Sequence, residues 1–222
     1  MTMRMVGSGR LVGAGLLTLT MLAGCAKPGE LVLADGVGIT AVRTACPAVG
    51  IPDYTGDITT FRSPAAGATA DNIDVVAAMT NVRPTCNESG DKVYSQASFD
   101  VLARRTDTRG ARRVELPYFV TVLRGGSAVV SKRVGTVVLD FADGQERARA
   151  SAQAGAYIDR AEATLPAEIR ERITRERRAG DQEAAVDPMT EPEVRAALAR
   201  ASFELLVGFH LTDAQLGYNA TR

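Results

Sequence analysis

The sequence is poor in the residue types from which most catalytic and nucleic-acid-binding sites are built. Its 222 residues include no Trp, one His and three Cys, and aromatic residues make up 5%. Lys and Arg together number 26, as do Asp and Glu, so the formal net charge is +0. A protein that coats nucleic acid carries a strong basic excess, so we expect no nucleic-acid partner. A hydrophobic content of 45% and a charged content of 23% are those of an ordinary globular protein.

The scarcity of His and Cys also removes most catalytic and metal-binding arrangements. A Ser or Cys nucleophile needs an adjacent base, and the only His, His210, lies between two predicted helices, where a structural or solvated role is commoner. Ser131 and Lys132 are neighbours in a predicted strand and therefore point to opposite faces, which excludes a Ser–Lys dyad. Zinc sites need clustered Cys or His ligands. We predict no catalytic residue, no metal site and no cofactor.

The first 24 residues have the pattern of an export signal. Residues 1–10 carry Arg4 and Arg10 and no acid, and residues 11–24 are apolar or small and uncharged. A basic segment followed by a short apolar one is typical of a signal peptide. The apolar stretch is shorter than the about 20 residues that a transmembrane helix needs.

The apolar stretch ends in Leu22-Ala23-Gly24-Cys25, which resembles the lipobox of bacterial lipoproteins. The resemblance implies cleavage between Gly24 and Cys25, a lipid on the Cys25 thiol and acylation of the new amino terminus. Two or more acyl chains make a stable membrane anchor. Ala26 and Lys27 follow, and the absence of Asp there favours the outer membrane of the cell envelope in that family, with the chain facing the periplasm. The alternative is an ordinary secretory signal with an incidental Cys.

Acylation of Cys25 leaves Cys46 and Cys86 as the two remaining thiols. The periplasm is oxidising, so a disulfide can persist there, and two thiols allow one intramolecular pairing. Closing this loop would stabilise the fold by roughly 4 kcal/mol in the chain-entropy treatment. We predict a Cys46–Cys86 disulfide, with two separate reduced thiols as the alternative.

The middle of the chain, residues 46–158, alternates between apolar and polar side chains with period two. This pattern is typical of antiparallel strands with one buried face. Residues 147–158 alternate as well but are rich in Ala, which also favours a helix; we interpret them as a strand. Six or seven strands in this length predict an immunoglobulin-like β-sandwich.

Two positions in this part punctuate the strands. Gly125-Gly126 separates two strand patterns and favours a tight hairpin turn. Pro117 lies inside a strand pattern, which predicts that this strand is an edge strand or is bulged at the proline.

After residue 158 the period changes to that of a helix, and we predict two or three helices. Candidate buried stripes are Leu165, Ile169 and Ile173, followed by a stop at Gly180, and Val194, Leu198, Ala201 and Leu205. Thr190–Glu193 and Thr212–Gln215 have the pattern of capping boxes. The predicted divisions are a cleaved signal peptide (1–24), a lipidated N-terminus and tether (25–45), the β-sandwich (46–158) and a helical C-terminal region (159–222).

Residues 104–113 carry the densest positive charge of the chain. They contain Arg104, Arg105, Arg109, Arg112 and Arg113 against Asp107 alone. One interpretation is an anion-binding patch for lipid head groups or an acidic partner, through bidentate arginine contacts. The alternative is a soluble hairpin tip whose arginine side chains protect strand edges from aggregation.

These observations predict a non-enzymatic lipoprotein of the bacterial envelope. It would contact the membrane through the acyl chains on Cys25 and would act in scaffolding, assembly or envelope maintenance through an envelope protein partner. The first alternative is a module that binds a small ligand or a glycan. An envelope hydrolase ranks last, because the chain lacks the His, Cys and Ser constellations of the common hydrolases.

Overall fold

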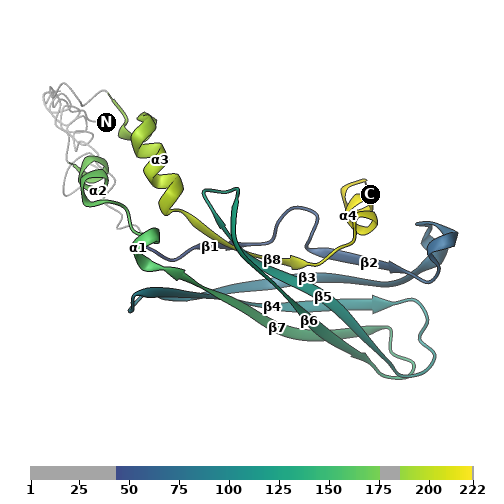
Figure 1. Cartoon of the computed structure of the whole chain (residues 1–222). Coiled ribbons are helices and arrows are strands. Elements are labelled where there is room, and N and C mark those ends of the chain that lie inside the picture. Colours follow the sequence, from purple (N-terminus) through teal and green to yellow (C-terminus); the bar gives the residue numbers. More distant parts are fainter. Residues whose placement is uncertain (1–43, 176–185, 222) are drawn as a thin grey trace, which may run out of the picture.

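The computed structural model describes residues 44–175 and 186–221. Within these residues the chain is mainly β, with two four-stranded sheets and with helices in its C-terminal part (Figure 1). The prediction of a mainly β body followed by helices is therefore confirmed, whereas the immunoglobulin-like outline stays a prediction.

The chain passes between the two sheets several times. The first sheet consists, in spatial order, of β1 (Ala48–Gly50), β8 (Phe203–Phe209), β5 (Arg112–Arg124) and β6 (Ala128–Phe141). The second consists of β2 (Asp57–Phe61), β3 (Ile73–Asn87), β4 (Lys92–Arg105) and β7 (Arg147–Asp159). The pairing of β1 with β8 is parallel and the other five pairings of described strands are antiparallel. The β4–β5 and β6–β7 links cross from one sheet to the other.

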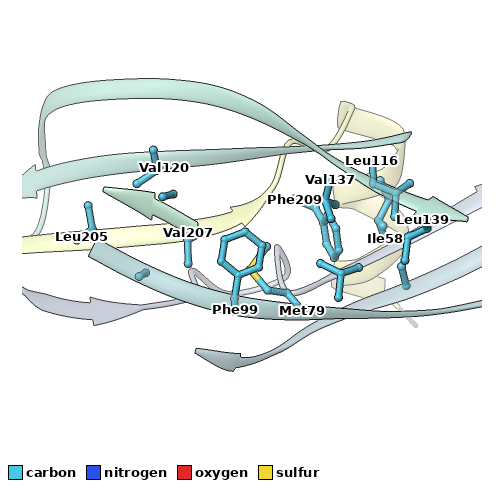
Figure 2. Packing of buried hydrophobic residues seen from close by; sticks show 14 of the residues in the cluster. Ile58, Met79, Phe99, Leu116, Val120, Val137, Leu139, Leu205, Val207 and Phe209 are labelled. Carbon is cyan, nitrogen blue, oxygen red and sulfur yellow. The ribbon is translucent and has the colours of Figure 1, made fainter. Parts of the chain in front are cut away.

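Figure 2 shows the hydrophobic core that lies between the sheets. One buried cluster contains Ile58, Met79 and Phe99 of the second sheet and Leu116, Val137, Leu139 and Phe209 of the first. Burying a side chain of this size contributes about 1.5–3 kcal/mol relative to leaving it exposed. Tyr118 of the first sheet also joins the two layers, because its ring meets the ring of Phe99 edge-on at a centroid distance of 5.2 Å.

Three details of the strands bear on the sequence predictions. Residues Arg147–Asp159 form β7, so the strand interpretation of this Ala-rich segment is confirmed. Gly125 and Gly126 have φ values of 61° and 77°, as a primed turn requires. The hairpin loop is one residue longer than a two-residue turn, because Arg124 pairs with Ala128.

Pro117 does not lie in an edge strand, since β5 is flanked by β8 and β6. The pairing with β8 ends at Tyr118, opposite Phe209. The missing N–H of Pro117 therefore falls just beyond the end of that ladder, where no strand partner requires it.

The C-terminal part is only partly helical. Its helices are α1 (Arg160–Ala163), α2 (Ala167–Thr174), α3 (Pro192–Ala201) and α4 (Asp213–Thr221), and a short 3-10 turn precedes α3 at Pro188–Thr190. Two other 3-10 turns, Pro64–Ala66 and Ala70–Asn72, lie between β2 and β3. The predicted helical stripe is wrong at its end, because the helix ends at Ala201 and Leu205 lies in β8. Phe203, Leu205, Val207 and Phe209 are buried at every second position, as in a strand. The segment pairs with β5 and lies between β1 and β5, so it is an interior strand.

The helices α2 and α3 share a second, smaller core. It consists of Leu165, Ile169, Ile173, Val194, Ala197 and Ala201. The helix α2 ends at Thr174, earlier than predicted, and the expected stop at Gly180 lies outside the described residues.

The two predicted capping boxes have different outcomes. Thr190 lies in a 3-10 turn, and the N-cap of α3 is Glu191, whose side chain makes no capping hydrogen bond. At α4 the box is present. The Gln215 backbone N–H donates to Thr212 Oγ1 at 3.3 Å, and the Thr212 N–H donates to Gln215 Oε1 at 2.9 Å.

Candidate functional site

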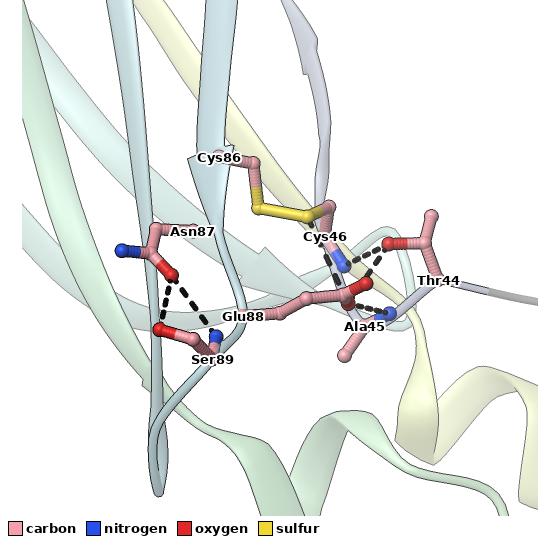
Figure 3. Close-up of a disulfide and its surroundings, with 7 residues drawn as sticks. All are labelled: Thr44, Ala45, Cys46, Cys86, Asn87, Glu88 and Ser89. Carbon is pink, nitrogen blue, oxygen red and sulfur yellow. Dashed lines mark hydrogen bonds between the residues drawn. A yellow bond between two sulfur atoms is a disulfide. The ribbon is translucent and has the colours of Figure 1, made fainter.

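A disulfide closes the end of the sandwich at which the chain enters it (Figure 3). Cys46 and Cys86 are bonded, with a Cα–Cα distance of 6.1 Å, so the predicted pairing is confirmed. Cys46 precedes β1 of the first sheet and Cys86 lies near the end of β3 in the second. The bond therefore ties the two sheets together, and we call this end the disulfide end.

The first described residues are held against the β3–β4 turn at the disulfide end. The Glu88 carboxylate accepts hydrogen bonds from Thr44 Oγ1 and from the Ala45 N–H, both at 3.0 Å (Figure 3). The predicted lipidation site Cys25 and the cleavage position after Gly24 lie outside the described residues. A tether from Cys25 would join the sandwich at this end.

The five arginines of residues 104–113 lie at the opposite end of the sandwich. The segment links β4 of the second sheet to β5 of the first, so the expected hairpin tip is wrong and the segment is a crossing link. Beside it runs the second crossing link, from β6 to β7, and the Gly144 N–H donates to the Thr108 carbonyl at 2.9 Å. We call this end the arginine end.

Arg105 is fully buried at the arginine end, with 0% of its surface exposed. Its guanidinium donates at 2.8 Å to the carbonyls of Thr108 and Gly110 in one crossing link and to those of Ala142 and Gln145 in the other. The side chain therefore binds the two links to each other. Because its donors are used inside the protein, Arg105 is not available to an external anion.

The other four arginines each form an ion pair with a carboxylate. Arg104 pairs with Glu146, Arg109 with Asp107, Arg112 with Asp74 and Arg113 with Asp140. In the Arg112 pair both terminal nitrogens donate to Asp74 at 2.6 Å, and these bonds hold the pKa of Asp74 below its ordinary value of 3.8. The geometry thus favours a structural role for the cluster, and anion binding stays a prediction.

A second polar cluster, on the outer face of the second sheet, was not predicted from the sequence. The Asp100 carboxylate accepts from Ser151 Oγ at 2.6 Å, from Arg149 Nη2 at 2.7 Å and from Asn81 Nδ2 at 2.8 Å. The hydrogen bonds from Ser151 and Asn81 hold the pKa of Asp100 below its ordinary value. A carboxylate held in its ionised form accepts hydrogen bonds and is unsuited to donate a proton as a general acid.

Asn81 reaches Asp100 because the backbone of β3 is bulged. Its φ of 54° is left-handed, a conformation that Asn tolerates better than most residues. The β3–β4 register shifts between Thr80 and Arg83, on either side of Asn81. The bulge shows in the sequence only as a change of phase, from inward Met79 to inward Val82. That change does not indicate which polar side chains the bulge brings together, which explains why the cluster was missed.

The structure also describes the remaining candidates from the sequence, His210, Ser131 and Lys132. The His210 side chain is exposed, and its backbone N–H donates to the Pro117 carbonyl at 2.9 Å. Ser131 lies opposite buried Val122, whereas Lys132 Nζ lies 5.3 Å from the ring centre of Phe119. The two adjacent side chains therefore point to opposite faces of β6.

An open hollow at the disulfide end contains Asp91, Asp159 and Glu162. Lys92 Nζ lies 3.9 Å from Asp159, and Arg124 Nη1 lies 3.4 Å from Glu162. Two of the three acids are thus engaged by cations. In residues 44–175 and 186–221, no three His, Cys, Asp or Glu side chains are grouped so that they could hold a metal ion.

No family model, curated protein or solved structure matches the chain. Within the part of the chain that the structure describes, no helix is both long enough and apolar enough to cross a bilayer.

Proposed function

We propose that the chain is a membrane-anchored bacterial lipoprotein that faces the periplasm and has a non-enzymatic role in scaffolding, assembly or maintenance of the envelope through protein contacts. The observation that carries the proposal is the sequence Leu22-Ala23-Gly24-Cys25 after an uncharged apolar stretch. The Cys46–Cys86 disulfide supports it, because disulfides persist in oxidising compartments such as the periplasm. The outer membrane is the location that the residues after Cys25 favour.

The polar clusters support a non-enzymatic role, because each serves the fold. Arg105 joins the two crossing links, Arg112 and Asp74 join β5 to β3, and Asp100 joins β4 to β7. The proposal includes the immunoglobulin-like outline of the sandwich, an architecture that many cell-surface proteins use for contacts with other proteins.

The test combines cell fractionation with crosslinking in intact cells, applied to the wild type and to Cys25→Ala. We expect the wild type in the outer-membrane fraction, crosslinked in stoichiometric amount to an envelope protein. We expect Cys25→Ala to be lost from that fraction, because it cannot be acylated. Recovery of the wild type from the cytosol contradicts the proposal.

A glycan-binding module is the second candidate, and one surface favours it. Tyr94 and Tyr157 lie side by side on the outer face of the second sheet with ring centres 4.7 Å apart, and Tyr157 is 65% exposed. Beside them Gln96 Nε2 donates to Gln153 Oε1 at 2.6 Å. Exposed rings can stack on the apolar face of a sugar while neighbouring amides bind its hydroxyls.

Affinity electrophoresis through gels that contain soluble peptidoglycan fragments tests this second candidate. We expect a retardation that Tyr157→Ala abolishes and that Tyr54→Ala, which removes a similarly exposed ring elsewhere, leaves unchanged. Equal mobility of the wild type in gels with and without the glycan rejects it.

A further inference from the structure

The strand β6 has an edge with which no described strand pairs. It is the last strand of the first sheet, and its strand partner is β5. Every residue from Ala128 to Val134 is exposed, and Val129, Val130 and Val134 expose 64%, 52% and 56% of their surface. Proteins normally cover, shorten or charge such an edge, because it can pair with a further strand. We call the unpaired side of residues 128–136 the β6 edge.

The backbone groups at the β6 edge can be assigned from the pairing. In an antiparallel ladder, successive residues direct their N–H and C=O groups to alternate sides. The Pro117 carbonyl accepts from the His210 N–H, so the backbone groups of Pro117 point away from β6. Its partner Thr136 therefore directs its backbone N–H and C=O away from β5. Val134 and Lys132, at every second position along β6, direct their backbone groups the same way.

Two positive charges accompany these backbone groups, which no described strand pairs. Lys132 and Arg133 have no carboxylate within ion-pair distance in the described part of the chain. Among the described residues, the β6 edge thus combines hydrogen-bonding groups without a strand partner, exposed valines and positive charge without a carboxylate partner. A second copy of the chain is a poor match, because pairing β6 with itself would bring these cations together.

We propose that the β6 edge binds an extended segment of another envelope protein, and that this segment carries apolar and acidic side chains. The bound segment adds a fifth strand to the first sheet. Strand addition of this kind draws its affinity from main-chain hydrogen bonds and its specificity from side chains. Here Lys132 and Arg133 select acidic residues in the added strand. The inference rests on the proposed function, since it names the surface and the chemistry of the protein contact.

The test measures binding of a fluorescent nine-residue peptide of valines with two adjacent glutamates at its centre, because Lys132 and Arg133 are adjacent in β6 and point to opposite faces. The protein is the full chain, purified from membranes in detergent, and binding is followed by fluorescence anisotropy at low salt. We expect the acidic peptide to bind, and a peptide with lysine in place of glutamate to bind about tenfold more weakly or worse. Added salt should weaken the binding, because exposed charges are screened.

Charge reversal on the protein supplies the matched comparison. The double variant Lys132→Glu, Arg133→Glu should bind the acidic peptide at least about tenfold more weakly and should prefer the lysine peptide. The control Arg147→Glu, Arg195→Glu changes two exposed arginines away from β6 by the same total charge and should bind as the wild type does. Thr136→Pro, which removes an outward N–H, should also weaken binding.

Three outcomes overturn the inference. They are no binding of the acidic peptide, binding that the Lys132 and Arg133 reversal leaves unchanged, and a dimer by light scattering that Thr136→Pro dissociates. The last result would assign the β6 edge to a second copy of the chain. Failure of the proposed function has a different signature, a wild-type chain that is not acylated and not in the envelope, and the peptide assay is independent of it.

Discussion

The two ends of the sandwich are closed by different chemistry. At the disulfide end a covalent bond joins the segment before β1 to β3, and at the arginine end the buried guanidinium of Arg105 joins the two crossing links. A disulfide acts mainly by restricting the unfolded chain. Arg105 acts in the folded chain, by donating hydrogen bonds to carbonyls of both crossing links and so holding the links together. Loss of the disulfide should therefore lower the stability of the fold without changing its local structure. Loss of Arg105 should lower the stability and also change the local structure at the arginine end.

The largest effect is expected for Arg105→Met, which keeps much of the side-chain volume but removes every donor. Four hydrogen bonds to carbonyls are lost, and although the Thr108 and Ala142 carbonyls keep a backbone donor, those of Gly110 and Gln145 lose the guanidinium. This loss should lower the free energy of unfolding by about 3–5 kcal/mol. Urea denaturation monitored by circular dichroism measures this loss.

Two variants in the same segment serve as controls for Arg105. Arg105→Lys keeps the charge but not the planar fork of donors, so its midpoint should lie between those of the wild type and Arg105→Met. Arg109→Gln removes an exposed arginine and should leave the midpoint unchanged. A midpoint for Arg105→Met equal to that of Arg109→Gln would show that Arg105 does not hold the crossing links.

The next largest effect is expected for the double variant Cys46→Ser, Cys86→Ser. Loss of the cross-link frees the unfolded chain, and the free energy of unfolding should fall by about 2–4 kcal/mol. The amide NMR spectrum at the arginine end should be unchanged, in contrast to Arg105→Met. Wild type treated with reductant should match the double variant, and a reduced protein as stable as the oxidised one contradicts the prediction.

A smaller effect is expected from the pair of Arg112 and Asp74, and it depends on pH. The pKa of Asp74 is lower in the folded chain than its ordinary value of 3.8, because Arg112 donates two hydrogen bonds to it. The pair therefore stabilises the fold above pH 3.8, and this contribution is lost as the pH falls through the lowered pKa. Asp74→Asn should be less stable than the wild type at pH 6 and should lose less stability between pH 4 and pH 2. Parallel acid-induced loss in both proteins would contradict this.

The smallest effect on stability is expected for the triple variant Arg104→Gln, Arg109→Gln, Arg113→Gln. These side chains are exposed, and exposed ion pairs contribute little. The same variant tests the anion-binding interpretation of residues 104–113. Weaker binding to anionic vesicles at low salt would support that interpretation, and unchanged binding would reject it.

The sequence patterns predicted the β-rich body because alternation directly reports one buried face. They missed β8 because Val194, Leu198, Ala201 and Leu205 keep helical spacing across Ser202, where the helix ends. Tertiary pairing with β5 decides this boundary, and one segment's periodicity does not report it. The disulfide was predictable because a cysteine count leaves few choices.

The special role of Arg105 was hidden by its four arginine neighbours, yet a signal existed. Val101 and Ala103 are buried at every second position of β4, and Arg105 continues that series. A charged residue at an inward position must find partners inside the fold. The bulge at Asn81 left a weaker signal, a change of phase in the apolar positions between Met79 and Val82, which does not report that Asn81 reaches Asp100.

The intact mass of the full chain, extracted from the membrane fraction under non-reducing conditions, decides whether this protein is an anchored lipoprotein of an oxidising compartment. We predict a chain that begins at Cys25, carries the added mass of its acyl groups and lacks the two hydrogens lost in the Cys46–Cys86 bond. An unmodified polypeptide that begins at Met1 would contradict the proposal.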